Sequence, residues 1–338
     1  ISESADHICA ERLQPNLEWL AKHLSRHGEL VLSEQLMAQL NRISVSTVKR
    51  ILSRIQQDKP RLPRRKPSWG NALTRDVPMR QIAWNEPQPG HFEVDLVHHS
   101  GPSSSGHYIH SLQMIDVATG WSERVATLGR CYQVMEDAFR RALTRLPFPV
   151  LEIHPDNGSE FFNAHLLRFF NDEAKVEEIS RSRPYRKNDN RFVEQKNSTL
   201  IREPLGYERL DTVAQTLAVN QLYDLMWLYY NFFQPVMRVS EKSIVPSNGH
   251  RSRVKRRYDN ARTPLDRLCE TDAISQAQKE HLLALRDQVN PRMLRQSIYD
   301  QIEHVFSLPN AVQGVAEDIY QTLAQPIYIP KGEDAWVT

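Results

Sequence analysis

Apolar residues recur at helical spacing in three stretches near the start of the chain, at residues 17–24, 33–40 and 44–57. The third stretch is apolar on one face and carries Lys49, Arg50 and Arg54 on the other. A compact trio whose last helix is basic outside and apolar inside is typical of a helix-turn-helix, although a plain helical bundle with a solvated face gives the same pattern. We expect residues 1–57 to form a helix-turn-helix DNA-binding domain, shortened at its start because the chain opens at Ile1 rather than Met.

Residues 58–90 lose this periodicity and are interrupted by prolines. Basic residues outnumber acids by seven to two between positions 58 and 80, and Arg64, Arg65 and Lys66 are consecutive. Proline stiffens such a segment, and its charge favours a phosphate backbone. We expect a basic linker that lies along DNA; a plain soluble linker has the same composition.

Alternating and helical patterns follow one another through residues 91–235, which predicts an α/β domain. Strands are expected at 91–97, 108–117, 121–128, 149–154 and 176–180. Helices are expected at 131–146, 161–171, 190–203 and 213–233. Three hairpin-linked strands followed by crossover units indicate a mixed sheet covered by helices.

The remaining residues, 236–338, are expected to form a C-terminal basic and helical region. Helices are predicted at 271–289, 291–306 and 310–324. Before them comes a cluster of cations that we expect to grip DNA phosphates: Arg251, Arg253, Lys255, Arg256 and Arg257.

Composition and charge exclude a few classes of protein but do not identify one. The chain has 338 residues, and 43 Lys and Arg against 41 Asp and Glu give a net charge of +2, so nucleic-acid binding must rest on local clusters. The three cysteines are far apart and form no metal-type pair. The longest apolar run, at 225–230, is far shorter than the ~20 residues of a membrane helix. We expect a cytoplasmic, nucleoid-associated protein.

Three acidic residues stand out by position. Asp95 lies inside the first strand between Val94 and Leu96, where an ionised carboxylate is costly unless it is paired or binds a metal. Asp156 follows the fourth strand, at the sheet edge where α/β proteins bind ligands, and Glu194 lies near the start of a helix. Three hard oxygen donors from two strands and a helix suit Mg²⁺ or Mn²⁺. Two such ions ~3.5–4 Å apart activate a nucleophile and stabilise the leaving oxygen of a phosphodiester.

Four motifs in order, across about residues 90–205, resemble the catalytic core of the retroviral integrase and DDE transposase superfamily. They are Phe-Glu-Val-Asp at 92–95, Met-Ile-Asp-Val-Ala-Thr-Gly-Trp at 114–121, Ile-His-Pro-Asp-Asn-Gly-Ser-Glu-Phe at 153–161, and Arg-Pro-Tyr at 183–185 followed by Glu-Gln-Lys-Asn at 194–197. The 37 residues between Asp156 and Glu194 are close to the family's usual spacing. The flanking regions are most similar to those of bacterial insertion-sequence transposases.

The resemblance implies an RNase H-like fold in which Asp95, Asp156 and Glu194 bind two metal ions. It also implies cleavage at a transposon end and attack of the freed 3′-hydroxyl on target DNA. The lysines that retroviral integrases place after the third acid are Ser198 and Ile201 here. Other residues are therefore expected to hold the DNA end: Arg183, Tyr185, Arg186, Lys187, Lys196 and Asn197. Tyr185 either stacks on a base or anchors its loop.

Joining two DNA ends needs two active sites, so we expect a dimer or larger assembly on double-stranded DNA. The chain has no Gly-rich phosphate loop, so an ATPase helper would be a separate protein. Two alternatives remain open: a catalytically silent DNA-binding regulator derived from a transposase, and an RNase H-like nuclease that cuts without joining.

Overall fold

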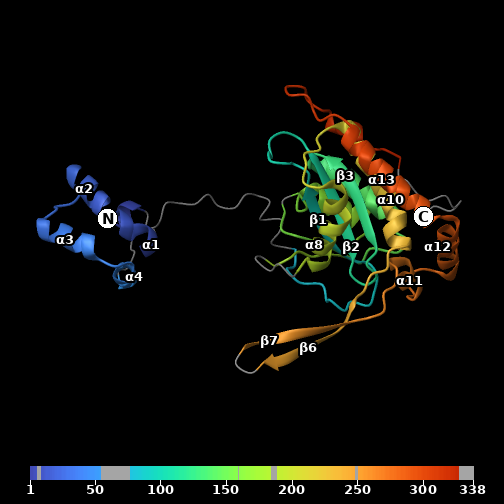
Figure 1. The fold of residues 1–338 in the computed structure, drawn as a ribbon, viewed down its shortest axis with the longest axis horizontal. Helices are drawn as coiled ribbons and strands as arrows, with labels where there is room; N and C mark the ends of the chain where they lie inside the picture. The colour runs from blue at the N-terminus through green and yellow to red at the C-terminus, as the bar shows by residue number, and fades with distance from the viewer. Residues whose placement is uncertain (6–8, 55–76, 159, 184–188, 248–249, 327–338) are drawn as a thin grey trace. The chain divides into compact units, whose positions relative to one another are not determined.

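The computed structural model describes the chain except residues 6–8, 55–76, 159, 184–188, 248–249 and 327–338. Only the backbone is described at residue 3 and at residues 244–247 and 250–253. Contacts divide the chain into two compact units, Ile1–Pro67 and Ser68–Thr338 (Figure 1). The predicted contacts of Arg64, Arg65, Lys66, Tyr185, Arg186 and Lys187 lie outside the described residues.

The first unit is a small helical bundle. Its helices are α1 (Ala10–Leu13), α2 (Leu17–Arg26), α3 (Glu34–Arg42) and α4 (Val45–Arg54), with 3₁₀ turns at Glu3–Ala5 and Gln14–Asn16. The three predicted helices are confirmed, and α1 is an addition. The bundle closes over a core of Ala10, Leu13, Leu17 and Val48.

The second unit is built on a mixed sheet of five strands. They are β1 (His91–His98), β2 (Ile109–Asp116), β3 (Ser122–Leu128), β4 (Glu152–Pro155) and β5 (Glu178–Ile179), in the order β3-β2-β1-β4-β5. Strands β1, β2 and β3 are antiparallel neighbours, whereas β4 runs parallel to both β1 and β5. The predicted mixed α/β architecture is confirmed.

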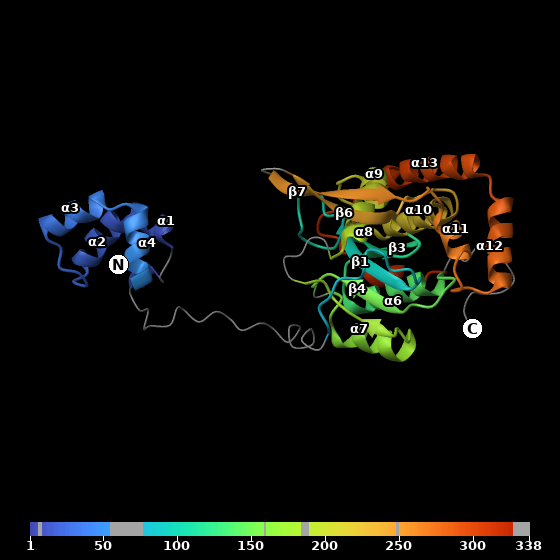
Figure 2. The same cartoon turned by 90° about the horizontal axis from the view of Figure 1, so that it is seen from below.

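Helices cover both faces of this sheet (Figure 2). One face carries α6 (Tyr132–Thr144) and α7 (Ala164–Arg168), which continues into a π-helical segment, Phe169–Glu173. The other face carries α8 (Arg191–Asn197) and α10 (Val213–Phe232), joined through the π-helical segment Ser198–Arg202 and α9 (Glu203–Leu205). Helix α10 begins at a capping box, in which Thr212 and Gln215 satisfy backbone groups of the first turn.

A two-stranded hairpin follows α10, formed by β6 (Val239–Ser247) and β7 (His250–Tyr258). It projects from the body of the unit (Figures 1 and 2). The sequence did not predict it, because strands without a buried face need no apolar alternation. The cations expected to form a charge cluster therefore lie along a strand.

Helices α11 (Pro264–Cys269), α12 (Gln276–Gln288) and α13 (Pro291–Ser307) complete the second unit. The helix predicted at 310–324 is wrong: only Ile319–Thr322 forms a helical turn, of the 3₁₀ type. Gly314 in that stretch has φ +84°, which an α-helix does not accommodate.

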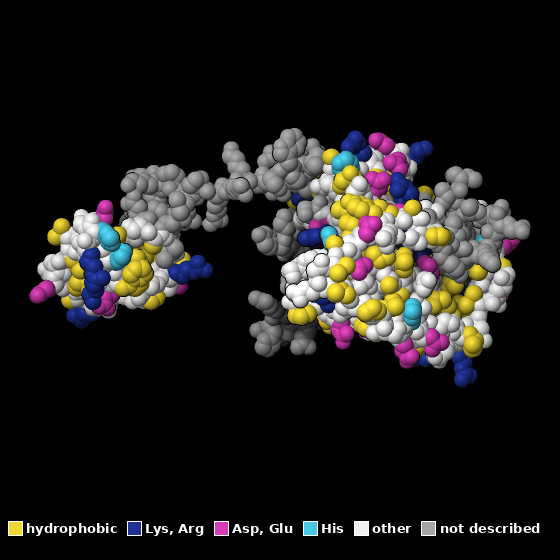
Figure 3. Space-filling model, turned by 90° about the horizontal axis from the view of Figure 1, so that it is seen from above, with side chains coloured by type: hydrophobic (Ala, Val, Ile, Leu, Met, Phe, Trp, Pro, Cys, Tyr) yellow, Lys and Arg dark blue, Asp and Glu magenta, His cyan; other side chains and the backbone are white. Residues whose placement is uncertain are grey.

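One hydrophobic core runs through the second unit. It includes Phe92, Phe139 and Trp227 together with Leu265 and Val305, so α11 and α13 pack into the same core as the sheet. Charged side chains of both signs are interspersed over the face of this unit in Figure 3. None of the helices in the described part of the chain is long and apolar enough to cross a membrane.

Candidate active site

Asp95 lies on the face of β1 that is covered by α8. Phe92, Val94 and Leu96 alternate with it and are buried in the core. The carboxylate of Asp95 accepts a hydrogen bond from the backbone N–H of Leu96 at 2.8 Å and one from the side-chain amide of Asn197 at 2.5 Å. Burial raises the pKa of Asp95, which these two hydrogen bonds partly offset.

Asp156 follows the last residue of β4, the strand that pairs in parallel with β1. Its side chain is exposed, and its Oδ1 accepts a hydrogen bond from the backbone N–H of Gly158 at 2.8 Å. The surrounding protein raises the pKa of Asp156, and the negative charges of Asp95 and Glu160 raise it further. The two predicted aspartates are therefore within electrostatic range of each other, Asp95 in the middle of β1 and Asp156 directly after β4.

Glu160 is a third acid at this place, and the sequence analysis gave it no role. A Cβ atom on Gly158 would lie 2.7 Å from the Glu160 carboxyl group and 2.9 Å from Oδ1 of Asp156. Both carboxylates thus border the space that the missing side chain leaves. Arg130 approaches Glu160 at 3.4 Å and is the cation at this edge. Its position four residues after Asp156, just past the Asp-Asn-Gly turn, was the signal that could have found it.

Glu194 lies on α8, and Glu93 determines where that helix begins. The carboxylate of Glu93 accepts hydrogen bonds from the backbone N–H groups of Phe192 at 2.6 Å and Val193 at 3.1 Å. It thereby satisfies donors that every helix start leaves open. Burial raises the pKa of Glu93 to about 7 despite these bonds. Helix α8 is held by Glu93 at its start and by Asp95 at its end, with Glu194 exposed between them.

The donor chemistry at Asp95, Asp156 and Glu160 suits a divalent cation. All are carboxylates, and the like charge of Glu160 raises the pKa of both aspartates. A bound cation would remove this repulsion. In the described residues, no three His, Cys, Asp or Glu side chains are grouped tightly enough to hold a metal ion as they stand.

Histidines and an arginine border the acids. The ring of His98 packs against those of Tyr108 and His110, with centroids 6.0 and 4.7 Å away. Burial and the charge of Arg130 lower the pKa of His98. Burial lowers the pKa of His110 to about 3, so this ring is neutral at physiological pH. The charge that His98 carries when protonated lowers the pKa of Asp95, so this ring lies within electrostatic range of the acid.

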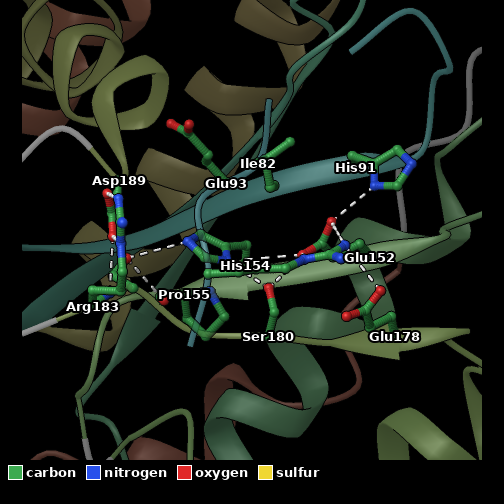
Figure 4. Close-up of polar contacts among 12 residues, drawn as sticks. Ile82, His91, Glu93, Glu152, His154, Pro155, Glu178, Ser180, Arg183 and Asp189 are labelled. Atoms are coloured by element: carbon green, nitrogen blue, oxygen red, sulfur yellow. Dashed lines mark hydrogen bonds and ion pairs between the residues drawn. The ribbon is translucent and has the colours of Figure 1, made fainter. Parts of the chain in front are cut away.

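A buried polar network links β4 to β1 and to the residue that follows β5 (Figure 4). Glu152 accepts hydrogen bonds from Arg80 and His91, both at 2.8 Å, and from Ser180. His154 in turn lies 2.5 Å from the hydroxyl of Ser180. Burial alone would raise the pKa of Glu152, but the hydrogen bonds outweigh it and hold the pKa at about 2. The network fixes the strand that carries Asp156.

The turn that follows Asp156 is tied to the end of β5. Asn157 donates a hydrogen bond to the carbonyl of Ser182 at 2.8 Å and accepts one from Arg181 at 2.8 Å. Arg183, a predicted DNA contact, donates two hydrogen bonds of 2.8 Å to the carboxylate of Asp189. Its side chain is therefore bound to another residue of the protein. The turn that carries Asp156 is therefore held in place by the hydrogen bonds of Asn157.

No family model matches the chain. A protein of Sinorhizobium fredii (strain NBRC 101917 / NGR234), described as "Uncharacterized protein y4rM", is 38% identical to it over 266 residues. The matched region covers 78% of this chain and 74% of that protein. The chain belongs to the same family as this rhizobial protein.

The remaining predicted DNA contacts are spread over both units of this family member. Lys49, Arg50 and Arg54 are exposed on α4 of the first unit. In the second unit, β7 exposes Lys255, Arg256 and Arg257 and carries Arg251 and Arg253, for which the backbone alone is described. Lys196 and Asn197 lie at the end of α8, and only Asn197 contacts one of the predicted acids.

Proposed function

We propose that this protein is a DNA transposase with an RNase H-like catalytic core and a DDE triad. The observation that carries the proposal is the placement of Asp95 and Asp156. They come from two hydrogen-bonded parallel strands, and Asp95 raises the pKa of Asp156. Carboxylates within electrostatic range of each other, one inside a strand and one just after the neighbouring strand, suit metal-assisted phosphodiester chemistry.

In this proposal Asp95, Asp156 and Glu194 bind two Mg²⁺ or Mn²⁺ ions, which would polarise the phosphodiester and activate the attacking oxygen. The protein's own residues position the acids. Asn197 holds Asp95, and the network around Glu152 holds the strand of Asp156. Water is the nucleophile for cleavage and leaves a 3′-hydroxyl. That hydroxyl then attacks a target phosphodiester in line, forming one bond as another breaks.

We also propose that the first unit is a helix-turn-helix that reads the element's end. Helix α4 buries Val48 and exposes Lys49, Arg50 and Arg54, so its cations are available to DNA. Two copies of the chain would act on the two ends.

The test is nicking and joining of supercoiled plasmid in Mn²⁺. Wild type should cut and join, whereas Asp156→Asn and Glu194→Gln should do neither while still binding DNA. The matched control is Asp172→Asn, at an exposed aspartate after α7, which should keep wild-type activity. Wild-type joining by Asp156→Asn would overturn the proposal.

Two other results identify the alternatives. Cutting without joining would identify a nuclease, and DNA binding without either reaction would identify a regulator. Glu160→Gln belongs in the same series, because loss of activity there with Glu194→Gln unaffected would assign the third acid to Glu160.

A further inference from the structure

A cavity of about 540 Å³ lies between α8 and the start of the β6–β7 hairpin. Trp84, from the segment before β1, closes one side, and Tyr258 of β7 contributes to another. No acidic side chain is found among the described residues that line it. Its charged lining is entirely cationic: Arg191, Lys196, Arg238, Lys242 and Arg256.

Lys196 lies on α8 and lines this cavity. Its ammonium group is partly buried and makes no hydrogen bond or ion pair with any described residue. Holding such an ammonium beside other cations is costly unless an anion joins them.

Arg238 forms no ion pair with a described residue, although the charges of Asp116, Glu93 and Asp259 act on it at longer range. One of its nitrogens donates a hydrogen bond to the carbonyl of Asp116 at 3.0 Å, but Nε finds no partner. Burial lowers the pKa of Arg238 to about 10. Gly120 makes room for this guanidinium, since a Cβ atom there would lie 2.9 Å from Nη2 of Arg238.

Aromatic rings hold the cations in place before any ligand arrives. The ring of Phe192 has the guanidinium of Arg191 at 4.4 Å and that of Arg238 at 4.6 Å from its centroid. The ammonium of Lys242 lies 4.2 Å from the centroid of the Trp84 ring. Cation–π contacts of this kind orient a charge without neutralising it. Arg191 also forms an ion pair with Glu93 at 3.8 Å, so the cations left for an anion in this cavity are Lys196, Arg238, Lys242 and Arg256.

We propose that this cavity binds a phosphate group of a DNA strand, with Lys196 and Arg238 as its principal donors. Lys196 immediately precedes Asn197, which contacts Asp95, so a strand held here passes close to the acids. The cationic lining reaches solvent at Arg256, which is exposed on β7. Cations that extend from inside the cavity to its solvent-exposed edge match a polyanion better than a small free anion. The choice of DNA rests on the proposed function.

The first experiment labels Lys196 in the full chain without divalent ions. Pyridoxal 5′-phosphate carries both a phosphate and an aldehyde, and borohydride reduces the imine that it forms with a deprotonated amine. Because the phosphate of the reagent would be held by the cations of the cavity, peptide mass spectrometry should show Lys196 labelled faster than Lys175, an exposed lysine of the same unit. A short duplex of arbitrary sequence should protect Lys196, and more strongly than inorganic pyrophosphate at equal phosphate concentration. Protection by pyrophosphate alone, or by neither, would overturn the proposal.

The second experiment measures DNA affinity against salt for Lys196→Gln. Loss of one phosphate contact should weaken binding and lower the slope of log K against log salt by about 1, with Lys175→Gln as the matched control. A wild-type slope in Lys196→Gln would overturn the proposal, whatever the labelling shows. Because neither experiment measures cleavage, repeating both in Asp156→Asn separates the two proposals. Protection that persists in that variant supports the cavity even if wild type never cuts DNA.

Discussion

The side-chain amide of Asn197 donates a hydrogen bond of 2.5 Å to the carboxylate of Asp95. This contact joins residues 102 positions apart and ties the end of α8 to the centre of β1. Glu93, two residues earlier on the same strand, holds the start of that helix. Two carboxylates of one strand thus set the position of the helix that carries Glu194.

Replacing Asn197 with alanine should destabilise the second unit. The buried carboxylate of Asp95 would lose a charge-assisted hydrogen bond, which costs about 1–3 kcal/mol. Urea unfolding measures the change. Gln195→Ala, at an exposed position of the same helix, should stay within about 0.5 kcal/mol of wild type. Equal stability of the two variants would show that the Asn197 contact contributes nothing.

Arg145→Met should be among the most destabilising single changes in the protein. Arg145 neutralises Glu123, at 2.9 Å, and both are buried. Glu123 also accepts hydrogen bonds from Trp121 and Trp227, and without Arg145 its charge would be buried unpaired. We expect a loss of about 3–5 kcal/mol in chemical denaturation.

The control for this prediction is Arg140→Met, because Arg140 forms ion pairs that remain largely exposed. That variant should lose no more than about 1 kcal/mol. Adding Glu123→Gln to Arg145→Met should recover part of the lost stability, since it removes the unpaired charge. A double variant as unstable as Arg145→Met would contradict this explanation.

Stability should fall on mild acidification because buried histidines must stay neutral. Burial lowers the pKa of His99 and His110 to about 3 and that of His154 to about 4. Because the pKa of each histidine is lower in the folded protein, its contribution to the free energy of unfolding is complete above the unfolded pKa of 6.5. That contribution is lost as the pH falls towards 3–4. Each group adds a slope of up to about 1.4 kcal/mol per pH unit in that window.

His110→Phe tests this dependence. It keeps a ring against Tyr108 but removes one proton-binding site, so the free energy of unfolding should fall less steeply between about pH 6.5 and pH 4. The exposed replacement His165→Phe should keep the wild-type slope. An unchanged slope in His110→Phe would mean that this histidine does not drive the acid sensitivity.

Gly158→Ala should impair catalysis more than folding. The added methyl group would meet the carboxylates of Asp156 and Glu160 at 2.9 and 2.7 Å and displace them. Because these are ends of side chains rather than backbone, the melting temperature should change little. Plasmid nicking in Mn²⁺ should fall at least tenfold, a misplacement effect. Full activity would show that the acids need not keep their present positions.

Most elements of the second unit could be predicted because each has a local signal. The strand at β1 and the helix at α10 carry periodic apolar residues that the fold buries. The β6–β7 hairpin has no periodic apolar residues. Its many cations indicated a charge cluster rather than a strand. The helix expected at 310–324 is wrong for the opposite reason. Its composition favours a helix, but Gly314 adopts a positive φ that an α-helix does not contain.

The candidate site likewise has features that the sequence predicted and features that it did not. The sequence alone determined that Asp95 lies within a strand and that Asp156 follows one, because alternation and turn residues are local properties. Only the tertiary structure decided which groups meet. It placed Glu160 beside Asp156, Asn197 against Asp95, and Lys196 in a cavity with Arg238. These contacts depend on how a helix docks on a sheet, and docking is set by packing and buried hydrogen bonds between residues far apart in the chain.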